Sequence, residues 1–371
     1  MSYTILQGNN RDTLKTLADA SIDAIVTDPP YGIGFLGKDW DSKKASETTS
    51  KMVAVQNLPS GMKHTSLADD LEFQYWMRDL WIECYRVLKP GGYVLSFSAA
   101  RTYHHMAMSL QTAGFEIRDQ IMWIYSSGFP KSQDIGKQID KAANKATKTI
   151  KNSTNKSRGE KIEGFDLGSG TRCPECKRDS NARYSCDKGQ DCGMVYKPQT
   201  KEAEQWAGWG TALKPAHEPI ALARKPAKLI IRENCQKYGV GALNIDAARM
   251  PNSEGDRFPS NVLGEIPDYQ KYFYCPKVSR KERHIDGATD NNHPTVKPIE
   301  LMKYLIRLIT PPGGVVLDPF NGSGSTGCAA VELGFNYIGC ELDPAYVDIA
   351  NKRIAAWLKA IDPLRASGLF E

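Results

Sequence analysis

Long apolar runs are missing from this 371-residue sequence: none approaches the ~20 residues that a membrane-spanning helix needs. The first ten residues, Met1 to Asn10, also lack the basic and apolar segments of a secretory signal peptide. We therefore expect a protein that makes no membrane contact and works in the cytoplasm. In that reducing compartment the nine cysteines are not expected to form a disulfide framework.

A large net charge is also missing, but the positive charge is concentrated in one place. The formal net charge is +5, whereas residues 131–161 carry eight Lys and one Arg against two Asp and one Glu, a local surplus of +6. A lysine run of this kind can be a solvated face with no binding role. It is also the electrostatic footprint of a surface that contacts the phosphate backbone of a nucleic acid.

The two ends of the chain show the alternation of strand and helix patterns that is typical of an α/β protein, and no internal repeat is visible. In the first part, apolar runs predict buried strands, with helical patterns between them. The strands are expected at 22–27, 93–98 and 117–125, and the helices at 73–88 and 105–113. Near the C-terminus the same alternation predicts helices at 299–309, 325–333 and 344–359 and strands at 315–317 and 337–340.

A stretch of different amino-acid composition separates the two ends. From residue 126 to about 290 the sequence is rich in Lys, Asn, Ser, Gly and Pro, without a sustained helical or strand period. The simplest arrangement is a doubly wound, mostly parallel α/β sheet assembled from both ends of the chain, with an inserted subdomain. We expect residues 1–130 and 291–371 to form the two halves of the sheet domain and residues 131–290 to form the insertion.

A glycine-rich turn follows a predicted strand and opens a predicted helix near the C-terminus. It runs from Asp318 to Gly327 and satisfies G-x-G-x-x-G, with Gly322 and Gly324 as the first two glycines. Glycine lets the backbone approach a ligand closely, and Asp318 at the strand end could accept hydrogen bonds from a cationic group. Glu341 ends the next predicted strand, where an acidic residue takes the ribose hydroxyls of a nucleotide. The pattern predicts a nucleotide-type cofactor.

A second turn, Asp28-Pro29-Pro30-Tyr31, follows the predicted strand 22–27. It lies at the carboxyl edge of the predicted sheet, where α/β proteins bind ligands. The prolines fix φ and hold each preceding residue extended, which points the Asp28 carboxylate and the Pro29 carbonyl into one site. Neither proline has an N–H that could compete for that site. A rigid turn with a surface tyrosine is the alternative without a function.

Together the two turns resemble a known family. Asp28 to Tyr31 is similar to the catalytic motif of amino-methylating DNA methyltransferases, and Leu317 to Thr326 is similar to their cofactor motif. The catalytic motif precedes the cofactor motif, which is the order of the permuted β-class, where the target-recognition region lies between them. Trp123 to Ser132 and Trp209 to Pro219 resemble stretches of phage and prophage members. The two ends of the chain match this family well, and the middle matches it loosely.

The resemblance implies S-adenosylmethionine as the cofactor, double-stranded DNA as the substrate and a homodimer as the assembly. His293 to Pro298 is similar to the segment that contacts the methionine end of the cofactor in this class. Asn9 departs from the family, which usually has an aspartate there to meet the cofactor's adenine amine, but an amide oxygen can also accept that hydrogen bond. The implied cofactor-binding residues are Asn9, Asp28, Thr295, Lys297, Asp318, Pro319, Phe320, Gly322, Gly324 and Glu341.

The chemistry of the implied reaction explains the residues of the catalytic turn. The lone pair of a base amine is delocalised into the ring, and the amine is therefore a poor nucleophile. Asp28 and the Pro29 carbonyl can hydrogen-bond the amine hydrogens and turn the lone pair toward a sulfonium methyl group. Pro30 keeps the turn rigid, and Tyr31 would stack on a base that has left the duplex. Asp28 favours adenine N6 over cytosine N4, since the cytosine enzymes of the family more often have Ser there.

Three other functions stand against this interpretation. A nicotinamide-dependent oxidoreductase would share the glycine-rich turn but has no use for Asp28 to Tyr31. A protein-glutamine or RNA methyltransferase commonly has Asn-Pro-Pro-Tyr after its cofactor motif, whereas this sequence has Asp and the reverse order. A catalytically inactive DNA-binding protein would not need a complete catalytic turn. The residues therefore favour a DNA amino-methyltransferase.

Four cysteines in the middle of the chain have the spacing of metal ligands. Cys173, Cys176, Cys186 and Cys192 form C-x2-C-x9-C-x5-C, in which the first pair has zinc-knuckle spacing and the second pair is wider than usual. No histidine lies between them, and four thiolates leave no open position for water, so that a zinc ion here would be structural. The alternative is four reduced cysteines without a common role.

We predict that the purified protein contains a structural zinc ion bound by these four cysteines. Elemental analysis should find zinc in the wild type and not in the double variant Cys173→Ser, Cys176→Ser, because two of the four thiolates are then lost. The variant should lose target choice and still bind S-adenosylmethionine, since the cysteines lie in the expected recognition region. A wild type without zinc, or a chain lacking residues 165–200 that methylates the same site, would contradict this.

Overall fold

The computed structural model describes residues 2–31, 66–125, 132–143, 198–213, 215–249, 258–264, 278–285, 289–293 and 295–366. The chain divides into two compact units. We call residues 1–127 with 216–371 the sheet unit and residues 128–215 the small unit.

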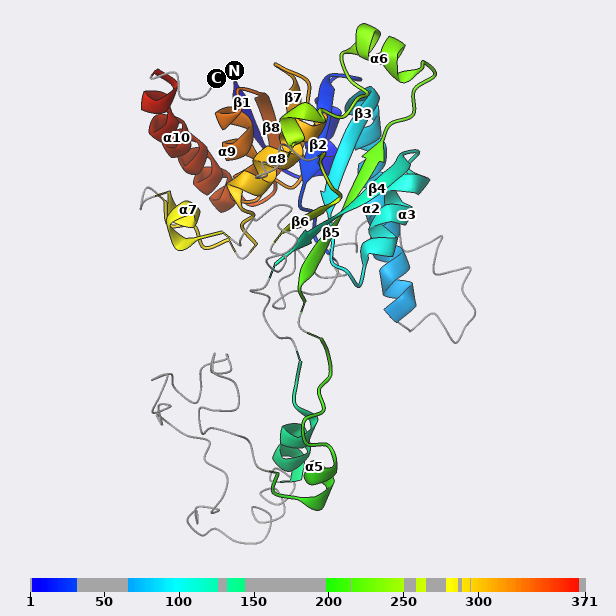
Figure 1. Ribbon diagram of the computed structural model, residues 1–371, viewed down its shortest axis with the longest axis vertical. Coiled ribbons are helices and arrows are strands. Elements are labelled where there is room, and N and C mark those ends of the chain that lie inside the picture. Colours follow the sequence, from blue (N-terminus) through cyan, green and yellow to red (C-terminus); the bar gives the residue numbers. More distant parts are fainter. Residues whose placement is uncertain are drawn as a thin grey trace. The chain divides into compact units, whose positions relative to one another are not determined.

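An eight-stranded sheet forms the centre of the sheet unit (Figure 1). The strand order is β1-β8-β7-β2-β3-β5-β4-β6, and neighbours are parallel except that β5 is antiparallel to both β3 and β4. The strands are β1 (Tyr3–Gln7), β2 (Ile22–Thr27), β3 (Leu88–Phe97), β4 (Glu116–Ile124), β5 (His217–Arg224), β6 (Val262–Gly264), β7 (Val315–Asp318) and β8 (Asn336–Glu341).

Helices cover both faces of this sheet, and the burial of β2 shows the consequence. All six residues of β2 are buried. Ala24 and Val26 pack with α8 and α9 on one face, and Ile25 packs with α2 and α3 on the other. A parallel strand covered on both sides is apolar without alternation, which is why β2 was visible in the sequence. One layer contains α1 (Asn10–Lys15), α2 (Ser66–Val87) and α3 (Tyr103–Thr112), and the other contains α8 (Ile299–Ile309), α9 (Ser325–Glu332) and α10 (Pro344–Ala366).

The doubly wound, mostly parallel fold is the one predicted from the sequence, but two of its strands come from an unexpected part of the chain. Both β5 and β6 lie in residues 131–290, which we expected to form the insertion. The compact unit that interrupts the sheet covers only residues 128–215. The apolar part of β5 is the four residues after Pro219, a weak local signal, and its place depends on hydrogen bonds to β3 and β4. Short elements in the connections are α6 (Ile231–Tyr238), η6 (Asp246–Ala248) and α7 (Arg280–His284).

A buried carboxylate holds two segments of the small unit together. Asp140 accepts hydrogen bonds from the backbone N–H groups of Gln199 (2.9 Å) and Thr200 (3.1 Å) and from the Thr200 hydroxyl (3.0 Å). The Thr200 hydroxyl oxygen in turn accepts the Ala203 N–H (3.1 Å) and caps α5 (Lys201–Gln205). Most of the basic stretch 131–161 lies outside the described residues.

The described parts of the chain contain neither a membrane-spanning helix nor a metal-binding group. There, no helix has both the length and the apolar character needed to cross a membrane. Nor do those parts contain a group of three or more His, Cys, Asp or Glu side chains that could hold a metal ion. Cys173, Cys176, Cys186 and Cys192 lie outside the described residues, and the zinc site stays a prediction.

The packing of α9 against its neighbours depends on the absence of a side chain at Gly327. A Cβ atom there would lie 2.5 Å from Cδ1 of Ile354 and 2.9 Å from Cε1 of Tyr337. Ile354 is fully buried, and the hydroxyl of Tyr337 donates a 2.7 Å hydrogen bond to Asn321. Neither neighbour can move away easily.

We therefore predict that Gly327→Ala lowers the free energy of unfolding by about 1–3 kcal/mol, as overpacking does, despite the ~1 kcal/mol that alanine gains over glycine in a helix. Urea denaturation would measure the change. In an Ile354→Val background, which lacks the clashing Cδ1 atom, the same substitution should cost less. An equal cost in both backgrounds would show that this contact is not the cause.

Candidate active site

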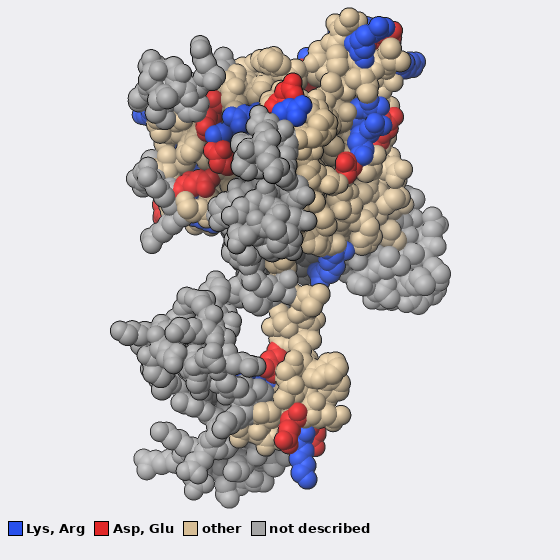
Figure 2. All heavy atoms as spheres, viewed as in Figure 1, with Lys and Arg blue, Asp and Glu red and all other residues tan. Residues whose placement is uncertain are grey.

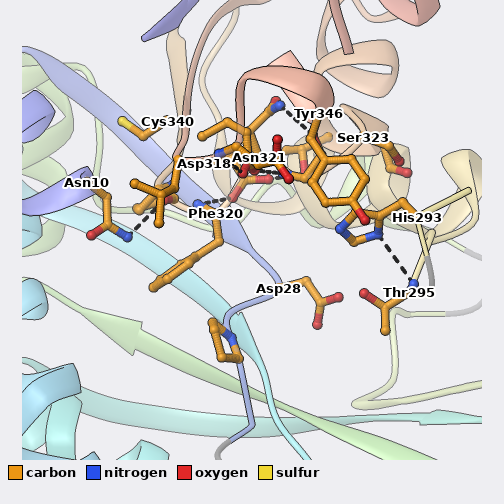
Figure 3. A pocket seen from close by; sticks show the side chains of 18 of the residues that line it. Asn10, Asp28, His293, Thr295, Asp318, Phe320, Asn321, Ser323, Cys340 and Tyr346 are labelled. Atoms are coloured by element: carbon orange, nitrogen blue, oxygen red, sulfur yellow. Dashed lines mark hydrogen bonds between the residues drawn. The ribbon is translucent and has the colours of Figure 1, made fainter. Parts of the chain in front are cut away.

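A cavity of about 480 Å³ lies at the carboxyl ends of β1, β2, β7 and β8, a size typical of a small-molecule site. Both predicted turns contribute to its wall. Asp28 and Pro30 come from the first, and Asp318, Phe320 and Gly322 come from the second (Figure 3). Because parallel strands end at the same edge, the pairing of β2 with β7 brings together two turns almost 300 residues apart.

The glycine-rich turn requires glycine at two positions. Gly322 and Gly324 have φ angles of +51° and +82°, in the left-handed region that disfavours residues with a Cβ atom. A Cβ atom at Gly322 would also lie 3.0 Å from Nε2 of His293, and one at Gly324 would lie 3.1 Å from the Cβ of Ala350. The turn therefore approaches both the loop that contains His293 and the helix α10 more closely than residues with a side chain would allow.

Asp318 fastens the two turns to each other. Its carboxylate accepts hydrogen bonds from the hydroxyls of Thr27 (2.7 Å) and Thr326 (2.6 Å) and from the backbone N–H of Phe320 (3.0 Å). Burial raises the pKa of Asp318 to about 6, although these three hydrogen bonds oppose the shift. The carboxylate lines the cavity, but the protein itself already uses both of its oxygens.

Glu341 is oriented by the backbone on either side of the cavity. Its side chain accepts the N–H of Gly322 (2.8 Å) and the N–H of Asp343 (2.9 Å). Burial raises the pKa of Glu341, and these backbone donors oppose that shift. A carboxylate with fixed orientation and free lone pairs is suited to accept hydrogen bonds from vicinal hydroxyls.

Asn10, Arg11 and Trp76 line the cavity near the end of β1, and the sequence analysis did not identify them. The predicted residue Asn9 lines the same part of the wall. The side chain of Asn9 caps α1 by accepting the N–H of Arg11 (3.0 Å), so that the predicted adenine acceptor already has one partner. Asn10 donates to the carbonyl of Pro319 (3.1 Å) and ties this edge to the glycine-rich turn. Trp76 of α2 lies with its ring centroid 6.3 Å from that of Phe320. Asn10, Arg11 and Trp76 carry no motif, and only the fold places them here.

The loop before α8 forms another wall of the cavity. His293 accepts the N–H of Thr295 through Nδ1 (3.3 Å), and its ring meets Tyr346 edge-on with centroids 4.6 Å apart (Figure 3). Burial, together with the nearby charges of Lys297, Arg283 and Arg353, lowers the pKa of His293 to about 4. At neutral pH this histidine is therefore uncharged. Thr295, a predicted cofactor contact, lines the cavity.

The side chain of Asp28 belongs to a buried charge cluster. The ammonium of Lys297 lies 2.5 Å from Oδ2 of Asp28 and 3.3 Å from Oε2 of Glu218. The Tyr31 hydroxyl lies 2.8 Å from Oδ1 of Asp28 and 3.1 Å from Oε2 of Glu218. Burial raises the pKa of Asp28, and so does Glu218, whereas Lys297 lowers it. Burial alone would lower the pKa of Lys297, but the two carboxylates together raise it.

Glu218 and Tyr125 are members of this cluster that the sequence analysis did not identify. The hydroxyl of Tyr125 donates to Oε1 of Glu218 (3.3 Å). Glu218 is on β5, one of the strands that were not predicted, and its only signal was its presence in a stretch that resembles phage proteins. Lys297 lines the cavity, as expected of a cofactor contact, but its ammonium contacts the catalytic turn.

Most of the predicted site residues meet at this one cavity. Within the described residues, Pro29, Tyr31 and Gly324 are the exceptions, because they lie beside the cavity without lining it. The predicted residues that line it are Asn9, Asp28, Pro30, Thr295, Lys297, Asp318, Pro319, Phe320, Gly322 and Glu341.

A doubly wound sheet with a ligand cavity between these two turns is the arrangement expected of an amino-methylating DNA methyltransferase, and the family comparison shows this class. The chain matches the N6/N4 DNA methylase family over residues 22–352 and belongs to that family. This membership excludes the nicotinamide-dependent oxidoreductase.

Individual relatives are similar along most of the chain. The Type II methyltransferase M.HindIII of Haemophilus influenzae is 26% identical over 357 residues, which cover 92% of this chain and 91% of the relative. The Type II methyltransferase M.HpaI of Haemophilus parainfluenzae is 23% identical over 370 residues, covering 98% and 78%. Among solved structures, the cytosine-N4-specific PvuII DNA methyltransferase shares the fold, with a TM-score of 0.52, 13% identity and coverage of 97% and 93%.

The raised pKa of Asp318 predicts a pH dependence of stability. The folded protein holds the carboxyl proton of Asp318 more tightly than the unfolded chain does, where the pKa of an aspartate is about 3.9. The stability that this proton contributes is therefore lost as pH rises through about 6. Between pH 5 and 7.5 the wild type should therefore lose about 1–1.5 kcal/mol of unfolding free energy relative to Asp318→Asn, which has no proton to release there. Urea denaturation of both proteins at the two pH values would test this. Parallel changes would refute it.

Proposed function

We propose that this chain transfers a methyl group from S-adenosylmethionine to N6 of an adenine at a specific site in double-stranded DNA. The observation that carries the proposal is the position of the Asp28 carboxylate in the wall of the cavity that the glycine-rich turn and Glu341 also form. Cytosine N4 is the alternative acceptor. Adenine is favoured because Asp28 stands where the cytosine enzymes of the family more often have Ser.

The residues of the cavity fit S-adenosylmethionine. Glu341, oriented by two backbone N–H groups, suits the ribose hydroxyls, and the Phe320 and Trp76 rings offer apolar contacts. The loop with His293 and Thr295 would hold the methionine end. When bound, the cofactor supplies a sulfonium methyl group, which is a strong electrophile.

The catalytic turn would prepare the base amine for that electrophile. The amine hydrogens need acceptors, and Asp28 and the Pro29 carbonyl provide them in the proposed complex. A charged carboxylate accepts with both oxygens, so that transfer should fail where Asp28 is protonated. The Tyr31 hydroxyl already contacts Asp28, which leaves its ring as the part that could stack on a flipped base.

Recognition of the DNA sequence needs a separate element, because a pocket for one flipped base cannot read its neighbours. We propose that the part of residues 131–290 outside β5 and β6, including the small unit and its cysteines, supplies it, and that the lysines of residues 131–161 contact phosphates. On the face that Figure 2 shows, the basic and acidic side chains of the described residues lie in mixed groups. The basic stretch is the candidate for backbone contact because residues 131–161 carry the local surplus of +6. A homodimer is the proposed assembly, and light scattering would test it.

The acceptor base can be identified directly. DNA from a host that expresses the chain would be hydrolysed to nucleosides and analysed by mass spectrometry, beside DNA from the same host without it. We expect new N6-methyladenine, and sequencing of the modified positions would give the recognition site. New N4-methylcytosine without methyladenine would instead support the alternative.

Catalysis and cofactor binding should respond separately to two substitutions. We predict that Asp28→Ala abolishes methyl transfer while S-adenosylmethionine still binds, because Asp28 acts on the amine in the transition state. Glu341→Ala should weaken cofactor binding in calorimetry, since it removes the proposed acceptor for the ribose hydroxyls. Normal turnover by Asp28→Ala on oligonucleotides would refute the catalytic role, and unchanged affinity of Glu341→Ala would refute the cofactor contact.

A further inference from the structure

Three distant segments of the chain place charged side chains around the catalytic carboxylate. Asp28 follows β2, Glu218 is on β5, and Lys297 directly precedes Pro298, the N-cap of α8. The exposed fractions of the three side chains are only 17%, 16% and 9%. A long, flexible lysine is normally solvated, and burying its ammonium requires partners. Its placement between two carboxylates is therefore a feature that needs an explanation.

The contacts fix the orientation of the Asp28 carboxylate. Lys297 bonds Oδ2, and the Tyr31 hydroxyl bonds Oδ1. Each carboxylate oxygen has two lone pairs, so that both can still accept a hydrogen from the cavity side. Lys297 is itself held by Glu218 at 3.3 Å and lies 4.8 Å from the centroid of the Phe97 ring.

The same contacts determine the charge of Asp28. A buried carboxylate beside another carboxylate tends to take up a proton, and an opposite charge within ~4–6 Å prevents it. Among the described residues, Tyr31 and Asp318 also interact with Asp28, His293 lines the same cavity, and Tyr125 lies behind Glu218. His293 is uncharged at neutral pH, and the two tyrosines stay protonated because burial raises their pKa values. Of these residues, Lys297 alone supplies positive charge.

We infer that Lys297 and Glu218 are positioning residues of the methyl transfer: Lys297 orients Asp28 and balances its charge, and Glu218 holds Lys297. This inference rests on the proposed function. It differs from the expected role of Lys297 as a contact to the cofactor. A protonated Asp28 would lose an acceptor for the amine, and methyl transfer would then depend on pH through this cluster.

The two residues have opposite charges, and their removal should shift the pH profile in opposite directions. Single-turnover methyl transfer would be measured from pH 5 to 9 on an oligonucleotide that contains the mapped site. The acid limb is the part of the profile in which the rate falls toward low pH. In Lys297→Met it should move to higher pH by about 1–3 units, because Asp28 then keeps its proton up to a higher pH. In Glu218→Gln, which preserves the shape, the limb should move to lower pH. S-adenosylmethionine affinity, measured by calorimetry, should stay within about threefold of wild type for both, less than 1 kcal/mol.

A second buried lysine offers a matched control. Lys303 of α8 has the same 9% exposure and pairs with Glu300 (2.6 Å) and Glu332 (2.5 Å), and it does not line the cavity. Lys303→Met should therefore leave the acid limb in place, even if thermal melting shows a loss of stability. Should Lys297→Met fail to fold, the isosteric Glu218→Gln still tests the direction of the shift.

The outcomes separate the inference from the function on which it rests. If wild type methylates DNA but the acid limb stays in place in both Lys297→Met and Glu218→Gln, the inference is overturned and the proposed function is not. A large loss of cofactor affinity in Lys297→Met, with the limb unchanged, would restore the role of a cofactor contact. Absence of any methylated base in wild-type reactions would overturn the proposed function and this inference with it.

Discussion

The pairing of β2 with β7 is the constraint on which the site depends. The two strands run parallel, with Ala24 beside Val316 and Ile25 beside Leu317, and they end at the same edge. The hydrogen bond from the Thr27 hydroxyl to Asp318 closes this edge at 2.7 Å. Without that register, the catalytic turn and the glycine-rich turn would have no common cavity, since they are almost 300 residues apart in the sequence.

Four acidic residues line the cavity, and the kind of partner distinguishes three of them, Asp318, Glu341 and Asp28. Asp318 is bonded mainly by hydroxyls of the protein and fastens the turns. Glu341 is bonded by backbone N–H groups, which orient it toward a ligand. Asp28 is paired with Lys297, which has the one ammonium among the described residues that line the cavity. Burial raises the pKa of all three, but only in Asp28 does an opposite charge oppose that shift. The chemistry proposed for each follows from its partner.

The elements that the sequence predicted are those whose signal is local. The strand Ile22–Thr27 and the helix Ile299–Ile309 were predicted with their observed ends, because both faces of the strand are buried and two prolines follow Thr310. The strands β1, β5 and β6 were not predicted. The β5 strand has a short apolar run and runs antiparallel between β3 and β4, a position that only pairing with distant segments decides.

The sequence by itself determined the chemistry of the two turns, since prolines and glycines restrict the backbone wherever they occur and carboxylates bring their function with them. It also determined the order of the turns and the family they resemble. Which side chains contact Asp28 was decided by the tertiary structure alone. Glu218 and Lys297 reach it from segments about 190 and 270 residues away, respectively. Side-chain contacts of this kind depend on strand order, which no local pattern encodes.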